Sequence, residues 1–488
     1  MRSWLVVTTL GLCVHWGCSD TAREFDNGGG QAGVAGEADA GEGGTTSTGG
    51  TLATAGDGNT GGSGVSGGGG PGAAGAAGAA GDGISGSAGA SGCGDGFAGA
   101  GCEDVDECLL GKDDCAAAAT CTNTTGSFEC DCNPGFLGNG TTCSARPFAS
   151  GFYSACAATE AGSIACWGRN RNGQLGTGAA DTNPHETPEA IVGLTGVENL
   201  AVGGWHACAV LNGGQVQCWG WAFYGQVGDD TTGDANGNRL QPTTVANVSA
   251  VQISAGYHHT CAVLSTGGVK CWGNNADGQL GDGAQESKSL APVAVSGLTS
   301  GVAAVATGQA HTCALMETGG VKCWGGSSQT PVDVVGLDKG VVQIAAGGGG
   351  STCAVLSTGD VKCWGSLTGS QLPTVVSGLS GIVHAAVGSD HACFVSAAGG
   401  VKCWGGNGFG QLGDDSQNAA EMPVDVKNLS SGVSQVELGY NTSCALLANG
   451  AITCWGSNTY GQIGITIPRT GNTAFSKVPA PIAGFPVP

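Results

Sequence analysis

The most informative segment of this chain is HHTCAVLSTGGVKCWGNNADGQLG, residues 258–281. Its two cysteines, Cys261 and Cys271, are ten positions apart, and Gly267 lies between them. If the cysteines face each other on antiparallel strands, the connecting loop has three residues, and Gly267 is the third. Such a loop needs a left-handed residue at that place, and glycine adopts this conformation without steric cost. The segment therefore predicts a β-hairpin that is closed by a disulfide.

The hairpin template occurs seven times in the chain. Its second cysteine falls at positions 166, 218, 271, 323, 363, 403 and 454, which are 40 to 53 residues apart. Repeats of this length with strand-like patterning are typical of a propeller or a solenoid. The flanking residues are apolar on both faces, as at 262–264 and 269, which fits blades packed between neighbours. The predicted disulfides join Cys156 with Cys166, Cys208 with Cys218, Cys261 with Cys271, Cys313 with Cys323, Cys353 with Cys363, Cys393 with Cys403, and Cys444 with Cys454.

Five units continue with a glycine-flanked turn, in the sequences GRNRNGQLG, GWAFYGQVG, GNNADGQLG, GGNGFGQLG and GSNTYGQIG. An apolar strand of the type PVAVSGL and a run such as VVQIAAG complete the unit. From residue 147 to 488 this pattern resembles the repeat of the regulator of chromosome condensation family, whose fold is a seven-bladed β-propeller. The resemblance implies an all-β propeller domain over residues 144–488.

The repeats depart from one another at two places. The turn is missing after Trp324 and Trp364, where the units shorten to 40 residues. The last unit stops at PAPIAGF and lacks the strand that follows it elsewhere. We therefore expect the N-terminal strand near Phe148 to complete the last blade and close the ring.

Residues 93–143 hold eight cysteines, and a segment this short needs a disulfide framework for its stability. Six of these cysteines lie in residues 104–143, where spacing alone allows 15 connectivities. This stretch resembles a calcium-binding EGF-like module, and the resemblance implies the pairs Cys108 with Cys121, Cys115 with Cys130, and Cys132 with Cys143. The preceding segment CGDGFAGAGC, residues 93–102, resembles the last loop of a truncated EGF module and would pair Cys93 with Cys102.

The EGF resemblance also implies a calcium site. Calcium takes six to eight oxygen ligands, so carboxylates, amides and backbone carbonyls must converge. Asp104 and Glu107 lie in DVDEC, and Asn123 lies in CTNTTGSFEC, at the side-chain ligand positions of the family. The alternative is a calcium-free EGF fold with a solvated acidic edge. The resemblance adds backbone carbonyls near Val105, Thr124 and Ser127, and Ca²⁺ is the expected cofactor.

The N-terminal residues 1–18, MRSWLVVTTLGLCVHWGC, have a positive charge at Arg2 followed by an apolar run. This is typical of a secretory signal and is too short for a spanning helix. The Gly17-Cys18 step resembles the lipobox of bacterial lipoproteins, in which Cys18 is lipidated; the alternative is ordinary cleavage and release. Residues 19–92 are rich in Gly and Ala and can bury little apolar area, so we predict a disordered tether.

The number of cysteines indicates the compartment of the protein, and its net charge limits the kinds of partner it can bind. Setting aside Cys13 and Cys18 leaves 22 of the 24 cysteines, and the pairs above use all of them, which implies an oxidising compartment. The formal charge of -22 repels nucleic acid and anionic lipid. We expect an extracytoplasmic protein, either anchored at the cell surface or outer membrane or secreted, with a monomeric propeller that contacts a membrane only through a lipid on Cys18.

Strand parity places a candidate partner-binding surface. In each unit one strand runs down to the glycine hairpin and the next returns, so both outer ends emerge on the face opposite the hairpins. In the second unit this face gathers Trp205, Trp221, Phe223 and Tyr224, and exposed aromatics are common anchors of interfaces. The acidic insertion 229–238 would form a polar rim. The alternative is that Phe223 and Tyr224 pack their own turn.

Other repeated residues carry weaker hypotheses. Four histidines, His206, His259, His311 and His391, recur two positions before a cysteine and could bind a metal. The alternative is packing, because three units have Ser or Thr there and no cysteine is free. The tryptophan of each CWG is predicted to pack between blades. The insertion 229–238 is acidic but lacks the glycine and distal glutamate of an EF-hand.

The sequence contains no phosphate loop, zinc-protease motif or nucleophile elbow. We predict an extracytoplasmic protein-binding or scaffold protein with the propeller as its recognition domain. The alternative is a hydrolase or lyase acting on an extracellular polymer, which perturbed carboxylates at the central funnel would reveal. The protein that gives the family its name promotes guanine-nucleotide exchange on a small nuclear GTPase, a partner that an exported chain does not meet.

Overall fold

The computed structural model describes residues 97–98, 103–117, 119–133, 136–138, 140–326, 328–468 and 474–485. Within these ranges no helix is long and apolar enough to cross a membrane. Three sequence predictions lie outside the described residues, namely the signal segment 1–18 with Cys18, the tether 19–92, and the pairing of Cys93 with Cys102.

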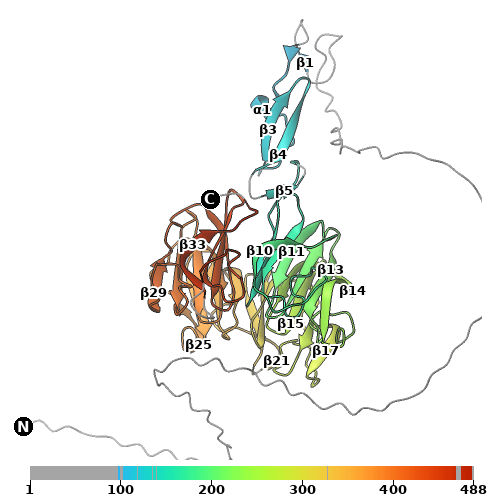
Figure 1. The fold of residues 1–488 in the computed structure, drawn as a ribbon, viewed down its shortest axis with the longest axis vertical. Coiled ribbons are helices and arrows are strands. Elements are labelled where there is room, and N and C mark those ends of the chain that lie inside the picture. The colour runs from blue at the N-terminus through green and yellow to red at the C-terminus, as the bar shows by residue number, and fades with distance from the viewer. Residues whose placement is uncertain are drawn as a thin grey trace, which may run out of the picture. The chain divides into compact units, whose positions relative to one another are not determined.

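The larger part of the described chain is a ring of seven four-stranded antiparallel blades, each built from consecutive strands (Figure 1). The first strand of each blade lines a central cavity, and the fourth is outermost. Blades 2 and 3 share the long strand β14 (Asn238–Ala255), so they form one continuous seven-stranded sheet. The all-β propeller predicted from the repeats is confirmed.

The remaining strands of blades 1 to 3 are β7 (Phe148–Ser150), β8 (Ser154–Ala158), β9 (Ile164–Gly168) and β10 (His185–Ala190); β11 (Val197–Val202), β12 (His206–Leu211) and β13 (Gln215–Trp221); and β15 (His259–Leu264), β16 (Val269–Asn274) and β17 (Lys288–Ala294). Blades 4 and 5 are β18 (Val302–Thr307), β19 (His311–Met316), β20 (Val321–Gly325) and β21 (Ser328–Asp333), then β22 (Val341–Ala346), β23 (Thr352–Leu356), β24 (Val361–Gly365) and β25 (Ser370–Val375). Blades 6 and 7 are β26 (Ile382–Val387), β27 (His391–Ser396), β28 (Val401–Gly405) and β29 (Ala420–Asp425), then β30 (Val433–Leu438), β31 (Thr442–Leu447), β32 (Ile452–Ser457) and β33 (Phe475–Pro481).

The second and third strands of each blade form the predicted hairpin. In blade 3, Cys261 lies directly opposite Cys271, and the N–H of Leu264 donates to the carbonyl of Gly268 across the loop at 2.8 Å. Gly267 has a φ of 78°, in the left-handed region that the loop requires. All seven predicted hairpin disulfides are present, with Cα atoms 4.0 to 4.1 Å apart.

The ring closes differently from the sequence prediction. The strand at Phe148, β7, pairs with β8 and is the first strand of blade 1, whereas the last sheet contains only β30 to β33. The prediction that this strand completes the last blade is therefore wrong. The reason is that the run counted as the end of each unit is the first strand of the next blade. The last unit needs no such strand, and blades 1 and 7 meet by packing Phe148 and Trp167 against Leu446 and Ile452.

Tryptophan side chains tie five pairs of neighbouring blades together. The Nε1–H of Trp219 donates to the backbone carbonyl of Gln174, in the GQLG turn of the preceding blade, at 2.9 Å. The predicted packing role of the CWG tryptophans is confirmed, since Trp219 is fully buried. Trp364 and Trp404 follow blades without this turn, and no such bond appears for them in the described chain. The equivalent bonds join Trp272 to Gln226, Trp324 to Gln279, Trp455 to Gln411, and Trp167 to Gln462.

A ring of glycines ends the first strands. A Cβ added to Gly203 would lie 2.4 Å from the carbonyl oxygen of Gly256 in the next blade, so the backbones touch. Corresponding contacts of 2.1 to 2.8 Å continue around the ring, without a gap between blades 7 and 1. Only glycine permits this approach. The ring consists of Gly151, Gly203, Gly256, Gly308, Gly347, Gly388 and Gly439.

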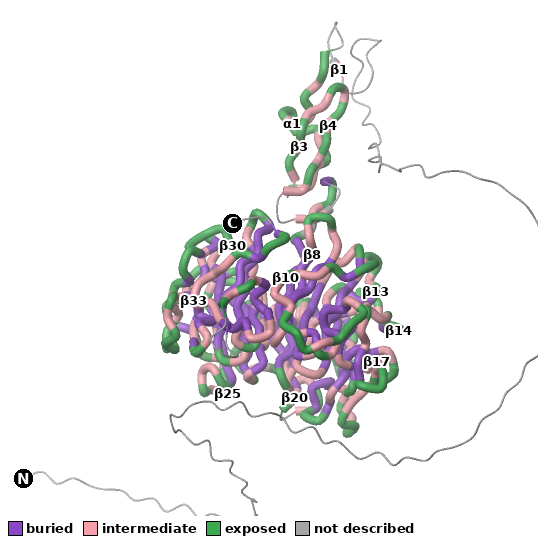
Figure 2. The backbone as a smooth tube through the Cα atoms, viewed as in Figure 1, coloured by how far each residue is buried: buried purple, intermediate pink, exposed green. Residues whose placement is uncertain are grey.

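The EGF module contains a short helix α1 (Glu107–Leu110) and the hairpin β3 (Ala119–Thr124) and β4 (Ser127–Cys132). Short pairs β1 (Phe97–Ala98) with β2 (Glu103–Asp104), and β5 (Phe136–Gly138) with β6 (Cys143–Ala145), lie before and after it. The three cystines implied by the family resemblance are present. Figure 2 shows that buried residues concentrate in the propeller blades, so the module depends on its cross-links.

Candidate functional site

The predicted calcium ligands surround the start of α1 and the end of β3. The side chain of Asp106 caps α1 by accepting from the N–H of Leu109 at 2.9 Å, which places Glu107 in the first turn. Asp104 accepts from the Asn123 amide at 2.8 Å and from the N–H of Gly126 at 2.5 Å. The structure therefore joins Asp104 to Asn123 directly, while α1 contacts both β3 and β4.

Among the described residues, two oxygen atoms at this place have no hydrogen-bond partner. They are Oε2 of Glu107 and Oδ1 of Asn123, and both are shielded from solvent. A buried oxygen without a donor costs free energy, which a cation would recover. The residues present thus fit a calcium ion held by Asp104, Glu107 and Asn123. Backbone carbonyls near Val105, Thr124 and Ser127 would complete the oxygen shell, and Thr124 pairs with Ser127 in the β3–β4 ladder.

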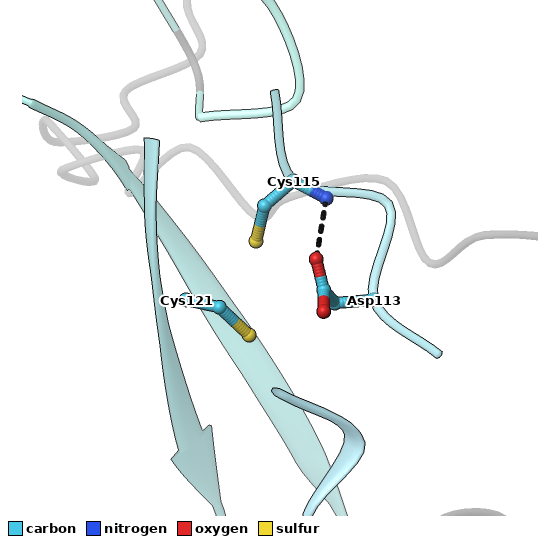
Figure 3. Close-up of side chains that lie close together, drawn as sticks. All are labelled: Asp113, Cys115 and Cys121. Carbon is cyan, nitrogen blue, oxygen red and sulfur yellow. Dashed lines mark hydrogen bonds between the residues drawn. The ribbon is translucent and has the colours of Figure 1, made fainter. Parts of the chain in front are cut away.

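A second group of potential ligands in the same module is not a metal site. Asp113, Cys115 and Cys121 lie close together, and Asp113 accepts from the N–H of Cys115 at 3.2 Å (Figure 3). Cys115 is bonded to Cys130 and Cys121 to Cys108. Neither sulfur can become the thiolate that binds a metal.

The predicted partner residues form one aromatic cluster on the face opposite the glycine hairpins. In blade 2, His206 at the start of β12 pairs with Gly220 near the end of β13, so both strand ends reach this face as predicted. The ring centroids of Trp205 and Trp221 are 6.1 Å apart. Trp221 stacks on Phe223 at 5.9 Å and meets Tyr224 edge-on at 5.5 Å.

The cluster extends into three further blades, which the sequence analysis missed. Tyr153 packs against Trp205 at 5.4 Å and Tyr460 at 5.4 Å, and Tyr257 packs against Phe152 at 4.8 Å. A signal for three of them was present, because Phe152, Tyr257 and Tyr440 each follow a ring glycine directly. We call the whole set the aromatic crescent; it consists of Phe152, Tyr153, Trp205, Trp221, Phe223, Tyr224, Tyr257, His258, Tyr440 and Tyr460.

Part of the crescent faces solvent. Phe223 is 49% exposed and Tyr440 is 41% exposed, so part of each ring is accessible to a partner. Tyr224 is less exposed, and its ring packs against Phe223 at 5.2 Å and His258 at 5.0 Å. The alternative that this pair packs its own turn thus fits Tyr224 better than Phe223.

A cation lies among the rings. The Arg169 guanidinium is 4.4 Å from the Trp205 ring centroid and 4.7 Å from that of Tyr460, within cation–π range. Burial raises the pKa of the neighbouring Tyr153 to about 12, so its hydroxyl stays neutral and can donate a hydrogen bond. The crescent combines apolar rings with a positive charge and neutral donors.

The acidic insertion borders the crescent and satisfies its own polar groups. Asp229 forms an ion pair with Arg239. Asp234 accepts from the N–H groups of Asn236 and Asn238 at 2.8 and 2.9 Å. A Cβ on Gly237 would lie 3.2 Å from Nε1 of Trp221, so the insertion runs beside the crescent. These contacts fit the predicted polar rim.

The four repeated histidines link neighbouring blades. Nε2 of His206 lies 2.7 Å from the Thr260 hydroxyl of the next blade. That hydroxyl donates to the Gln226 carbonyl at 2.8 Å, so the histidine nitrogen must be the donor. In the described chain no three of these histidines come together as metal ligands. The equivalent distances are 2.9 Å for His259 to Thr312, 2.8 Å for His311 to Thr352, and 2.9 Å for His391 to Ser443.

One of these links resembles a hydrolase triad. Nδ1 of His391 lies 3.6 Å from Asp390, and Nε2 lies 2.9 Å from Ser443. The Ser443 hydroxyl, however, donates to the Gln411 carbonyl at 2.7 Å, so its proton does not point at the histidine. Ser443 and His391 are also fully buried. The arrangement is a blade link and cannot present a nucleophile to a substrate.

Family profiles match both parts of the chain. Residues 104–143 match the calcium-binding EGF domain. A profile of the regulator of chromosome condensation (RCC1) repeat matches 161–210, 213–263, 266–315 and 398–446. A second profile of this repeat matches 197–226, 250–279, 302–329, 382–411 and 433–462.

Two curated relatives and two solved structures illustrate the likeness. The ultraviolet-B receptor UVR8 of Arabidopsis thaliana is 33% identical over 186 residues, which are 37% of this chain and 41% of the receptor. The probable E3 ubiquitin-protein ligase HERC4 of Mus musculus is 32% identical over 178 residues, which are 35% of this chain and 16% of the ligase. The alignment thus spans less than half of either relative.

The solved structures are similar in fold. Yeast RCC1 (Prp20), in its complex with Kap60, aligns with a TM-score of 0.57 and 20% identity over 70% of this chain and 84% of that chain. Human WBSCR16 aligns with a TM-score of 0.56 and 21% identity over 65% of this chain and 94% of that chain. The fold and its sites define a disulfide-linked β-propeller with a calcium-binding EGF domain. The propeller is built from repeats of the regulator of chromosome condensation family.

Proposed function

We propose that this chain is an extracytoplasmic binding protein whose propeller recognises a protein partner through the aromatic crescent. The observation that carries the proposal is the crescent itself, which gathers side chains from blades 7, 1, 2 and 3 on one face. The disulfides and the EGF domain indicate an extracytoplasmic location. A nuclear exchange activity like that of the founding family member is not proposed for such a chain.

The composition of the crescent suits protein recognition. Aromatic residues and arginine are enriched at the energetic centres of interfaces, and single truncations there can cost about 2 kcal/mol or more. Exposed Phe223 and Tyr440 would be desolvated by a partner, and the insertion beside Trp221 would supply a polar rim.

The EGF domain and the N-terminal segment have supporting roles in this proposal. Calcium would fix the start of α1 against β3, and the tether would hold the folded domains away from a surface. A lipid on Cys18 would anchor the chain there; release after cleavage would leave it secreted.

The test is capture of a partner by the full calcium-loaded chain from surface extracts, followed by measurement of its affinity. Trp205→Ala combined with Trp221→Ala should weaken that affinity by roughly thirtyfold or more, given about 2 kcal/mol for a central aromatic. The matched control is Leu372→Ala with Val375→Ala, which removes exposed apolar side chains on β25, outside the crescent. A double tryptophan variant that folds normally and keeps full affinity would rule out the crescent as the binding surface.

A further inference from the structure

The first strands of the seven blades enclose a cavity of about 420 Å³. At the crescent end Phe152 lies across it, with its ring 4.8 Å from Tyr257 and 5.7 Å from Tyr440. A Cβ on Gly348 would fall 2.3 Å from Cζ of Phe152, so this ring reaches from blade 1 to blade 5. Glu198 also lines the cavity and is exposed, so solvent enters from the hairpin end.

At one level of the cavity wall a single side chain is neither small nor neutral. The residues two positions before the ring glycines all line the cavity, and six of the seven are small. The exception is Glu437 in β30, at the junction where blade 7 meets blade 1. Ser254, at the same level in blade 3, is satisfied by its hydrogen bond with Thr307 at 2.8 Å. The small residues are Ala149, Ala201, Ser254, Ala306, Ala345 and Ala386.

Glutamine side chains that line the cavity bond the backbone of the next blade, and this explains why the Glu437 carboxylate has few hydrogen-bond donors. Gln343 uses both ends of its amide on the backbone of Ala385 in the next blade, at 2.9 and 2.8 Å. Gln435 instead divides its N–H₂ between the Phe148 carbonyl at 3.3 Å and Glu437 Oε1 at 2.7 Å. On this wall the Glu437 carboxylate therefore accepts a hydrogen bond from a neutral donor, the Gln435 amide.

The other titratable groups that line the cavity do not neutralise Glu437. Arg146 donates to the Gly450 carbonyl at 3.3 Å at the hairpin end. His384 bonds the Val436 carbonyl through Nε2 at 2.9 Å, and burial lowers its pKa, which disfavours a positive charge there. Glu198 is itself acidic. Burial raises the pKa of Glu437 to about 7, partly opposed by the hydrogen bond from Gln435.

We propose that the central cavity binds a small primary ammonium compound, with Glu437 as its counter-ion. An ammonium group supplies a positive charge and three donors for a carboxylate that has one neutral partner. The small wall residues leave room for a short aliphatic chain in this cavity of about 420 Å³. A divalent metal fits less well, because it needs several carboxylates or carbonyls at one point.

The site implies a proton linkage. The ammonium group binds the ionised carboxylate, so affinity should rise with pH as Glu437 loses its proton near pH 7. Binding at pH 6 should be about tenfold weaker than at pH 8, which is the ratio of ionised fractions for a group with this pKa. Burial lowers the pKa of His384, which disfavours a positive charge on it.

The experiment titrates the full calcium-loaded chain with n-butylammonium chloride by calorimetry at pH 8. Glu437→Gln keeps the shape and the Gln435 contact and should weaken binding at least tenfold. Glu198→Gln, which removes the same charge at the hairpin end, should change it little. Tetramethylammonium, which lacks N–H donors, should bind more weakly than n-butylammonium.

A second measurement covers the case in which Glu437→Gln fails to fold. In the wild-type chain, NMR of the Glu437 carboxyl carbon should show its pKa falling by one unit or more when n-butylammonium is added. Equal binding by wild type and Glu437→Gln, no binding by wild type, or an unmoved carboxyl titration would each overturn the proposal. Partner capture by the crescent should survive in Glu437→Gln, so the two proposals fail separately.

Discussion

The long and short blades of this propeller differ in one turn, and the difference has two consequences. Blades 1, 2, 3, 6 and 7 carry the GQLG turn after the third strand, whereas blades 4 and 5 do not. Each turn accepts a hydrogen bond from the tryptophan of the next blade. The turns of blades 2 and 7 also carry Trp221 and Tyr460 of the crescent. The same segment thus locks the ring and supplies side chains for recognition.

The junction between blades 4 and 5 lacks two of the links found elsewhere. Trp364 has no turn carbonyl to bond, and Ala304 stands where Gln252 and Gln343 reach the backbone of the next blade. His311 still bonds Thr352 at 2.8 Å across this junction. The junction of blades 5 and 6 likewise lacks a turn bond for Trp404 and has Ser351 in place of the linking histidine. We therefore expect both junctions of blade 5 to be weaker than that of blades 3 and 4, which has all three links.

The largest expected contrast is between two tryptophans. Trp219→Ala should lower the free energy of unfolding by about 3–5 kcal/mol, because it empties a fully buried site and frees the Gln174 carbonyl. Trp404→Ala should cost clearly less, since Trp404 is only partly buried and follows a short blade. Trp219→Phe keeps an aromatic ring but removes the Nε1–H donor and part of the ring volume, so its cost should lie between about 1 kcal/mol and that of Trp219→Ala. Denaturant unfolding that gave equal losses for Trp219→Ala and Trp404→Ala would break the comparison.

The disulfides give the next contrast. Replacing Cys208 and Cys218, or Cys353 and Cys363, by alanine should cost at most about 3 kcal/mol in either blade, because the closed loops are equally short. Hydrogen exchange should then rise more in blade 5 than in blade 2, where the Trp219 bond still holds the blade. Non-reducing peptide mapping of the wild type must find all seven hairpin bridges within single blades. A bridge between blades would contradict the repeat architecture.

The junctions that contain a buried linking histidine should lose stability in acid. Burial lowers the pKa of His206 and His259 to about 3 and that of His311 to about 4, below the usual value of 6.5. As the pH falls, these histidines take up protons in the unfolded chain before they do so in the folded chain. The free energy of unfolding is therefore unaffected by them above pH 6.5 and decreases as the pH falls from 6.5 toward 3. Each histidine should cost about 1.4 kcal/mol per pH unit in this window.

The junction of blades 5 and 6 has Ser351 in place of the linking histidine, but buried His384 lies there, 3.4 Å from the Gln343 amide. The control for the pH effect is therefore a variant and not another junction. His206→Gln keeps an N–H donor for Thr260 and should flatten the pH dependence of the unfolding free energy. An unchanged slope in that variant would show that His206 does not carry the effect.

Calcium should bind the EGF domain and leave both the long and the short blades of the propeller unaffected. Glu107→Ala removes a charged ligand and should weaken calcium binding in calorimetry. Asp113→Asn, whose carboxylate lies beside two cystines, should leave it unchanged. Absence of calcium heat for the wild-type chain would refute the site.

Local sequence patterns predicted the hairpins and the EGF domain well. The spacing of Cys261, Gly267 and Cys271 within eleven positions is enough to predict the hairpin loop and its disulfide. The DVDEC motif places Asp104 and Glu107. The ring closure at Phe148 was predicted wrongly, because the sequence repeat does not show where a blade begins.

Other features could not be predicted because they depend on contacts between distant repeats. Phe152, Tyr257 and Tyr440 come together only when blades 1, 3 and 7 surround one axis. Glu437 looks like an ordinary strand residue in VSQVEL until the ring places it in a cavity. The turn carbonyl that Trp219 bonds is 45 residues away in the chain.

Hydrogen–deuterium exchange of the chain with its captured partner tests the central claim most directly. The account predicts protection on the crescent side of blades 7, 1, 2 and 3, including peptides with Tyr153, Trp221 and Tyr440, and little change in the loops of blades 4 and 5. Protection confined to the short blades or to the glycine hairpins, with the crescent unchanged, would contradict it.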